Sequence, residues 1–309
     1  MSVSPEDIEQ AAGRLHGHVR RTPILPLELG AFGSHAQLTL KLELLQHSGS
    51  FKARGAFNSL LSMTVPKAGV VAASGGNHGA AVAFAAHSLG HRAEIFVPSL
   101  AAKAKIARIE SLGANVHVIP GAYADALAAA EAHQRETGAI GIHAYDAPAT
   151  VAGQGTLARE LDAQMTQVDT VLVAVGGGGL IGGIAAWFEG RVNVVGVEPK
   201  ACPTLESAFR AKAPVDVEVG GIAADSLGAR RIGALPFSIA KQFVEGVVLV
   251  DDEAIRAAQT ALWRELRLAA EPGGATALAA LLSGAYKPAV GEKVAVILCG
   301  GNVDPSSLA

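Results

Sequence analysis

Two patterns of apolar positions alternate along most of the chain. Short runs rich in β-branched residues recur between alanine-rich stretches whose apolar residues repeat at helical spacing. The strand-like runs are QLTLKLE, GVVAAS, RAEIFVP, NVHVIP, IGIHAY, TVLVAV, VNVVGVEP, GVVLV and KVAVILC. Near-continuous apolar strands separated by helices are typical of parallel sheets covered on both faces. The pattern therefore predicts an α/β fold built from open parallel sheets.

The stretch SGSFKARG places a lysine at the start of one predicted helix. Ser50 is the expected N-cap of the helix that continues through AFNSLLSM, which puts Lys52 in its first turn. The first turn carries the positive end of the helix dipole and disfavours an ammonium group. Lys52 is therefore either a solvated surface lysine or an amine that binds a carbonyl cofactor as a neutral group or an imine.

Composition narrows the function classes. The chain has 309 residues, enough for two domains, and its net charge of −3 comes without a basic stripe, so nucleic acid and anionic membranes are poor partners. Cys202 and Cys299 form no CxxC motif, and neither a disulfide framework nor a zinc site is indicated. The first residues lack an apolar signal segment, and four glycines interrupt the uncharged stretch 171–188, so we expect a cytoplasmic protein without a membrane helix.

Polar and glycine residues gather at the ends of predicted strands. In open parallel sheets, ligands bind at the carboxyl ends of the strands. Reading only those ends gives four candidate site segments, which are Ser74–His78, Gly176–Gly179, Glu198 and Cys299–Asn302.

The glycine run GGGGLIGG offers backbone N–H groups and a helix N-terminus to an anion, most plausibly a phosphate. It lacks the Gly-Lys-Ser/Thr of a Walker A loop. It does contain GxGxxG at Gly177, Gly179 and Gly182, with Glu198 ending the next strand, which also fits an NAD-dependent oxidoreductase. A third interpretation is a glycine-rich turn that only allows close strand–helix packing.

Six ordered motifs together are far more specific than the glycine run alone. The segments GSFKARGA, SGGNHGAA, VAGQGT, GGGGLIGG, GVEP and CGGN resemble the serine/threonine dehydratase family of fold type II pyridoxal-phosphate enzymes, in which serine racemase is a relative. The resemblance runs from about Glu43 to Asp304. It implies a tryptophan synthase beta-like fold of two open parallel-sheet domains, with residues 1–62 plus 151–309 forming the large cofactor-binding domain and 65–145 a small mobile domain.

The resemblance assigns pyridoxal 5'-phosphate as the cofactor and gives roles to its ligands. Lys52 would form the Schiff base and then act as the base for the α-proton, a role that suits a shielded lysine with a lowered pKa. Asn77 would hydrogen-bond the ring hydroxyl, and Phe51 would pack beside the ring unless it is simply a core residue. The phosphate would bind the glycine run, which comprises Gly176, Gly177, Gly178 and Gly179.

The substrate carboxylate would bind at the turn that begins the helix after GVVAAS. The resemblance places Ser74, Gly75, Asn77 and His78 there, with the helix N-terminus assisting. A lone histidine at a helix start is more often a cap than a ligand, so His78 is a weaker candidate than Asn77.

Cys299 matches the position that faces the pyridine nitrogen in this family. A thiol does not hold a proton-sharing ion pair with the ring as a carboxylate does, so the ring nitrogen should stay unprotonated, which favours prompt elimination of a β-hydroxyl. Cys299 would equally suit a buried core position. Glu271, in EPGGA, is expected near the ring without a catalytic role.

Metal binding is not expected. Metal-dependent relatives pair the glutamate that matches Glu198 with an aspartate six residues on, where this chain has Thr204. One carboxylate without its partner is a weak site for a hard divalent cation, so Glu198 is interpreted as a structural residue at a strand end. The segment around Asp225, GGIAADSLGA, departs from the family's usual TIADG, which leaves the role of Asp225 open.

The predicted function is dehydration and deamination of L-threonine or L-serine to a 2-oxo acid and ammonia. Hydroxyaspartate and phenylserine dehydratases share these motifs and stay open as alternatives, as do a serine racemase and a non-catalytic ligand-binding protein. Racemisation is disfavoured because Gly75 stands where serine racemase has its proton-donating serine. The resemblance also implies a homodimer. Only seven residues follow Asn302, so no C-terminal regulatory module is expected.

Overall fold

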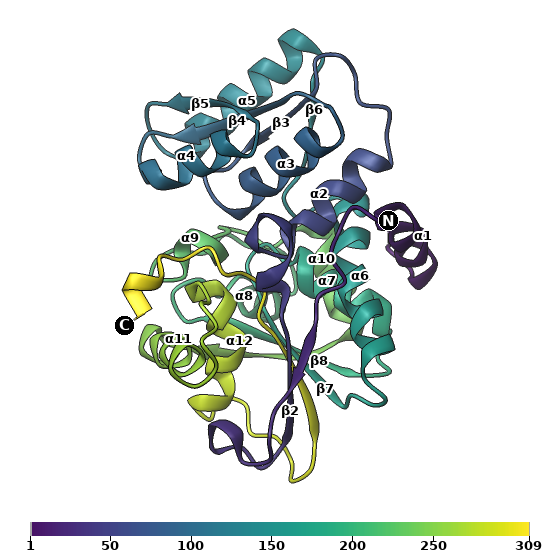
Figure 1. Ribbon diagram of the computed structural model, residues 1–309, viewed down its shortest axis with the longest axis vertical. Coiled ribbons are helices and arrows are strands. Elements are labelled where there is room, and N and C mark those ends of the chain that lie inside the picture. The colour runs from purple at the N-terminus through teal and green to yellow at the C-terminus, as the bar shows by residue number, and fades with distance from the viewer. Residues whose placement is uncertain (1, 309) are drawn as a thin grey trace.

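The computed structural model describes residues 2–308, which form two α/β units stacked along the long axis of the molecule (Figure 1). The larger unit contains a six-stranded sheet in the order β1-β2-β10-β7-β8-β9, parallel throughout except for β1 against β2. Its strands are β1 (Ile24–Pro26), β2 (Gln37–Lys41), β7 (Thr170–Ala174), β8 (Asn193–Pro199), β9 (Val244–Val250) and β10 (Lys293–Ile297).

Helices cover both faces of this sheet. On one face α12 (Pro272–Leu282) packs against β7 to β10, and α11 (Asp252–Leu266) packs on α12. On the other face α7 (Gly179–Phe188) lies against β7 and β8. Further helices complete this unit: α1 (Pro5–Leu15), α6 (Pro148–Gln164), α8 (Thr204–Ala211), α9 (Ala224–Leu227) and α10 (Ala234–Phe243).

The smaller unit is a four-stranded parallel sheet in the order β5-β4-β3-β6. Its strands are β3 (Val70–Ala73), β4 (Ala93–Pro98), β5 (Asn115–Ile119) and β6 (Ile140–Gly141). One face is covered by α3 (Asn77–Ser88) and α4 (Lys103–Ser111), and the other by α5 (Tyr123–Thr137). Helix α2 (Lys52–Leu61) contacts both α6 of the larger unit and α3 of the smaller one. The starts of α2 and α3 therefore lie where the two units meet.

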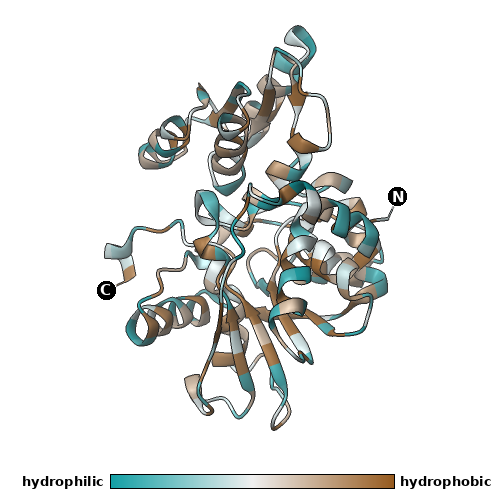
Figure 2. Cartoon of the chain, turned by 45° about the vertical axis from the view of Figure 1, so that its right-hand side comes forward, coloured by the Kyte–Doolittle hydropathy of each residue, from teal (hydrophilic) through white to brown (hydrophobic). Residues whose placement is uncertain are grey.

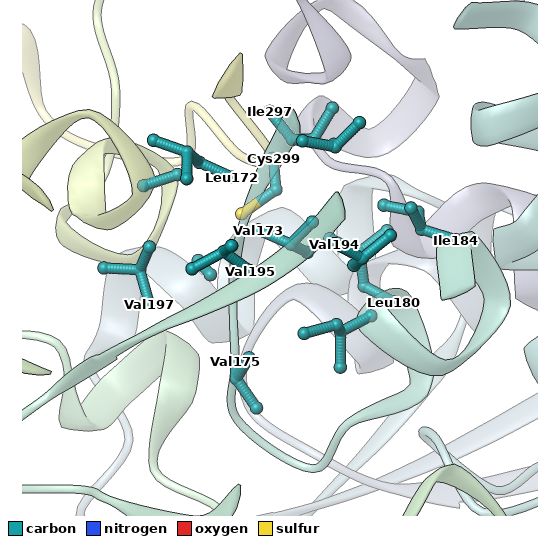
Figure 3. Packing of buried hydrophobic residues seen from close by; sticks show 14 of the residues in the cluster. Leu172, Val173, Val175, Leu180, Ile184, Val194, Val195, Val197, Ile297 and Cys299 are labelled. Atoms are coloured by element: carbon teal, nitrogen blue, oxygen red, sulfur yellow. The ribbon is translucent and has the colours of Figure 1, made fainter. Parts of the chain in front are cut away.

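The core follows the predicted apolar runs. Strands β7 and β10 are almost entirely buried, and side chains from neighbouring strands, such as Leu172, Val195 and Ile297, pack together in one cluster (Figure 3). Hydrophobic segments run along the strands of the larger sheet, and hydrophilic segments are frequent on the outer helices and loops (Figure 2). This distribution is what hydrophobic burial demands of an amphipathic helix on a buried sheet.

The structure confirms the predicted α/β class and refines its strands. Each strand-like run of the sequence contributes a strand, although in IGIHAY only Ile140–Gly141 pairs. Strand β1 was not predicted, because its three residues form a short antiparallel edge that depends on its partner β2. The uncharged stretch 171–188 folds as β7, a glycine turn and α7. Among residues 2–308, no helix combines the length and apolar character needed to cross a membrane.

Candidate active site

Lys52 is the first residue of α2, as predicted, but Ser50 does not cap the helix. The N-cap is Phe51 and it makes no side-chain capping bond. Ser50 is extended and pairs with Gly300, while the Phe51 N–H donates to the Cys299 carbonyl. The prediction of a Ser50 N-cap was wrong because Ser50 pairs with Gly300, a residue far away in the sequence. The buried Ser50 hydroxyl has no hydrogen-bond partner among the described residues.

The Lys52 side chain lies between the two units. Its Nζ donates a hydrogen bond to the Ala144 carbonyl at 2.8 Å, beyond the end of β6, and lies 5.1 Å from the centroid of the Phe51 ring. Burial lowers the pKa of Lys52 to about 8, and Cys299 exerts a smaller effect in the opposite direction. A lysine with this pKa is partly a neutral amine near neutral pH, as Schiff-base formation with an aldehyde requires.

The turn after β3 leads directly into α3. Gly76 is the N-cap, and the Ser74 hydroxyl accepts a hydrogen bond from the Gly76 N–H at 3.2 Å. The first N–H groups of a helix have no intrahelical partners and carry the positive end of its dipole. Because Gly75 and Gly76 line the cavity described below, this turn can receive a carboxylate.

The His78 imidazole is hydrogen-bonded to the protein backbone. Its Nε2 lies 2.8 Å from the Ile142 carbonyl oxygen, so this nitrogen carries the proton and donates. Burial, with a smaller contribution from Lys52, lowers the pKa of His78 to about 3, and the ring is therefore neutral at physiological pH. The ring links α3 to the end of β6. Its other nitrogen, Nδ1, can only accept a hydrogen bond, so His78 can donate to a carboxylate only through its backbone N–H.

The glycine run connects β7 to α7. Gly178 is the N-cap of α7 and has φ +88°, which glycine adopts without strain. Side chains at Gly177 or Gly179 would overlap Tyr145, which packs directly against the run. Gly176 and Gly177 are partly exposed and Gly178 and Gly179 are buried. A glycine turn at a helix start is a suitable cradle for a compact phosphate.

Cys299 follows β10 and lies in the main hydrophobic cluster (Figure 3). Its Sγ is 3.4 Å from the Gly273 carbonyl. Burial, reinforced by nearby Glu271, raises the pKa of Cys299 far above its usual value, with smaller opposing effects that include Lys52. The group is therefore a neutral thiol at any physiological pH, as the sequence argument requires.

Two polar residues from the large unit meet Asn77, and their contacts were not predicted. Glu271, at the N-cap position of α12, accepts a hydrogen bond from Asn77 Nδ2 at 2.5 Å. Asn302, in the CGGN motif, donates to Asn77 Oδ1 at 2.6 Å. Burial raises the pKa of Glu271 to about 7, against smaller opposing effects from the Asn77 hydrogen bond and from Lys105 and Arg108.

Glu198 has a structural role, as expected. Its carboxylate is completely buried and accepts hydrogen bonds from the N–H groups of Leu205 and Glu206, which begin α8. The Thr204 hydroxyl lies 2.8 Å from Glu198 Oε1 and 2.6 Å from the Gly176 carbonyl. Burial raises the pKa of Glu198 to about 7 despite these hydrogen bonds. A carboxylate engaged in this way is not available to bind a ribose hydroxyl.

A cavity of about 470 Å³ opens between the units at the start of α3, and its lining includes neither Lys52 nor the glycine run. Its wall includes Gly75, Gly76, Asn77 and Glu271. At its rim Lys105 of α4 forms an ion pair with Asp225 of α9, and Arg108 donates to the Ser48 carbonyl at 3.1 Å. The cavity thus joins the candidate carboxylate turn to solvent, and contacts between the two units frame it.

The arrangement fits pyridoxal phosphate on its own chemistry. Lys52, whose pKa is lowered by burial, and the neutral Cys299 thiol lie close enough to affect each other's pKa. The glycine turn begins another helix, α7, and has Tyr145 packed against it. The family model for "Pyridoxal-phosphate dependent enzyme" matches residues 15–300. The chain belongs to this family of pyridoxal-phosphate enzymes, and the dinucleotide interpretation of GxGxxG is wrong.

Individual relatives narrow the class further. An L-threonine ammonia-lyase from Thermotoga maritima is 36% identical over 98% of this chain and 76% of its own length. A phenylserine dehydratase from Ralstonia pickettii is 35% identical over 98% of this chain and 95% of its length. The structure of maize serine racemase superposes with a TM-score of 0.94 at 32% identity, covering 100% of this chain and 96% of that one. The similarity supports the predicted pyridoxal-phosphate ammonia-lyase class over nearly the whole chain.

Proposed function

We propose that this protein dehydrates and deaminates a β-hydroxy amino acid, L-threonine or L-serine first, to a 2-oxo acid and ammonia. The observation that carries the proposal is the partly buried Lys52 amine, which lies at the boundary between the units. It is close enough to His78, in the turn that can hold a carboxylate, to affect the pKa of that residue. Threonine ammonia-lyases and dehydratases among the relatives support the same reaction.

Bound pyridoxal phosphate would supply an electron sink that acidifies the substrate α-proton and allows the β-hydroxyl to leave. Lys52 and the glycine run Gly176–Gly179 would hold it, with Phe51, Asn77 and Cys299 around its ring. Lys52 Nζ would accept the α-proton, because its lowered pKa leaves a large fraction neutral near pH 8. The neutral Cys299 thiol would place no charge beside the ring.

The turn from Ser74 to His78 would bind the substrate carboxylate. The hydroxyl of Ser74 and the first N–H groups of α3 provide donors, and the helix dipole adds a favourable field. His78 would contribute through its backbone, because its ring is bound to Ile142. Gly75 leaves this wall without a side chain that could exchange a proton.

The two units would move relative to each other during turnover. We assign residues 1–62 and 151–309 to the large domain and 65–145 to a small domain that carries Asn77 and closes over the substrate. The contacts between units, including Lys105 with Asp225, are those that closure would form. A homodimer in the cytoplasm completes the proposal, and size-exclusion chromatography with light scattering tests the dimer.

A substrate panel tests the proposed reaction and resolves its main alternatives. The holoenzyme is assayed for ammonia and 2-oxo acid with L-threonine, L-serine, 3-hydroxyaspartate and phenylserine, and K52A is the control. We expect L-threonine or L-serine to give the highest kcat/KM, and K52A to lose at least about 1,000-fold, since base and cofactor anchor disappear together. A higher kcat/KM with phenylserine or hydroxyaspartate would make that amino acid the substrate in place of threonine or serine. Absence of ammonia release from all four amino acids would refute dehydration.

A further inference from the structure

Asn77 is held by side chains from two distant segments of the chain. Asn302, from the loop after β10, donates through Nδ2 to Asn77 Oδ1 at 2.6 Å and also to the Ser48 carbonyl at 2.9 Å. Glu271 accepts from Asn77 Nδ2 at 2.5 Å. Four groups therefore form one continuous line of hydrogen bonds: the Ser48 carbonyl, the Asn302 amide, the Asn77 amide and the Glu271 carboxyl group.

The groups at the two ends of this line decide which amide atoms donate and which accept. The Ser48 carbonyl can only accept, so the Asn302 atom that faces it must be the nitrogen. The same nitrogen faces Asn77, whose nearest atom must then be the oxygen. The Asn77 nitrogen is thereby turned to Glu271, whose carboxylate is an acceptor. The Asn77 nitrogen has two hydrogens, and only one is used by Glu271.

Two glycines make room for the line. A side chain at Gly49 would overlap the Asn302 amide oxygen, and a side chain at Gly300 would overlap Glu271 Oε1. Arg108 also reaches this place, where its guanidinium donates to the Ser48 carbonyl at 3.1 Å. The line is therefore built into the SGSFK and CGGN segments and does not rest on flexible surface side chains.

We propose that Asn302 and Glu271 are positioning residues that fix the polarity of the Asn77 amide, so that Asn77 always presents an N–H group to the cofactor. An asparagine free to flip would present its oxygen part of the time, and that oxygen would repel the ring phenolate of pyridoxal phosphate, which can only accept a hydrogen bond. The proposal rests on the assignment of Asn77 as a cofactor ligand in the proposed function, but not on the identity of the substrate.

The variant Asn302→Asp tests directly whether the orientation of the Asn77 amide matters for cofactor binding. An ionised aspartate accepts but does not donate, so Asn77 must turn its nitrogen to residue 302 and its oxygen toward Glu271 and the cofactor. The matched control, N302A, removes the contact without reversing it. A second control, E271Q, keeps an oxygen available for Asn77 Nδ2 and removes only the charge.

The measurement is the dissociation constant for pyridoxal phosphate, obtained by titrating each apoenzyme, together with the apoenzyme unfolding temperature. We expect the dissociation constant to rise about tenfold in N302A, as for one lost hydrogen bond, and about 100-fold or more in N302D. E271Q should stay within about threefold of the unchanged protein. The holoenzyme absorption maximum should shift in N302D only.

The outcome that overturns the proposal is equal cofactor affinity in N302D and N302A, which would make Asn302 a packing residue. If N302D proves too unstable, the double variant N302D/E271Q replaces it, because glutamine can donate to the reversed Asn77 oxygen. The proposal predicts that N302D/E271Q regains the unfolding temperature of the unchanged apoenzyme while its affinity for pyridoxal phosphate stays low. Recovery of both the unfolding temperature and the affinity would refute the proposal. Cofactor affinity is measured without substrate, so failure of the dehydratase assay is distinguished from failure here.

Discussion

At the scale of single residues, the proposed chemistry depends on the position of Lys52. The residue is partly buried at the start of a helix, and both desolvation and the helix dipole favour the neutral amine. With a pKa of about 8, the neutral fraction of the free lysine falls about tenfold for each pH unit below 8. We therefore expect the rate at which the apoenzyme captures pyridoxal phosphate to rise steeply from pH 6 and to level off above pH 8. Stopped-flow absorbance measures this rate, and a plateau that begins below pH 7 or above pH 10 would contradict the assigned environment.

At the same scale, we propose that Gly75 favours dehydration over racemisation. Gly75 has no side chain that could donate a proton on the side opposite Lys52, so D-serine should form far more slowly than pyruvate from L-serine. A Cβ at Gly75 would lie 3.1 Å from the Ala101 Cβ, so a serine needs extra room. The variant G75S/A101G should gain racemisation, and A101G alone should not. Chiral chromatography of residual serine measures both rates, and D-serine accumulating as fast as pyruvate in the unchanged protein would refute the argument.

At the scale of elements, the β8–α8 connection bears on metal dependence. The Glu198 carboxylate caps α8 through the Leu205 and Glu206 N–H groups, and the Thr204 hydroxyl lies beside it in place of a second carboxylate. A carboxylate used in this way has little capacity to bind a hard divalent cation. Activity should therefore survive exhaustive chelation, with an unfolding temperature unchanged within about 2 °C. A steep loss that magnesium restores would contradict this account of the connection.

Local sequence patterns predicted the elements better than they predicted the polar contacts. The strands and the glycine turn before α7 were predicted because their signals lie in consecutive residues. The Ser50 cap was wrong because Ser50 pairs with Gly300 from the other end of the chain. The contacts of Asn77 join residues 194 and 225 positions apart, with Glu271 and Asn302, and no local pattern encodes such a pair. The packing of Tyr145 against the glycine run was not predicted for the same reason. Its local sign in the sequence is that Gly177 and Gly179 have no side chains, which leaves room for Tyr145.

At the scale of the whole molecule, the two units meet around the site. The ion pair between Lys105 and Asp225 joins α4 to α9 across the cavity, yet both side chains are partly exposed. Exposed pairs contribute about 0–1 kcal/mol, so D225N should hardly change the free energy of unfolding. It should instead increase hydrogen exchange in α4, because α4 loses its contact with α9. The matched control is R159A, which removes the exposed Arg159–Glu9 pair away from the cavity and should leave α4 unchanged. Unchanged exchange in D225N would show that this pair does not hold the units together.

Lys52 is the residue that we propose binds pyridoxal phosphate. Reduction of the holoenzyme with borohydride fixes the cofactor to its lysine, and peptide mass mapping then identifies the modified residue. We predict one pyridoxyl adduct, on the peptide that contains Lys52, and its loss in K52A. An adduct on another lysine in the unchanged protein, or none at all, would contradict the account.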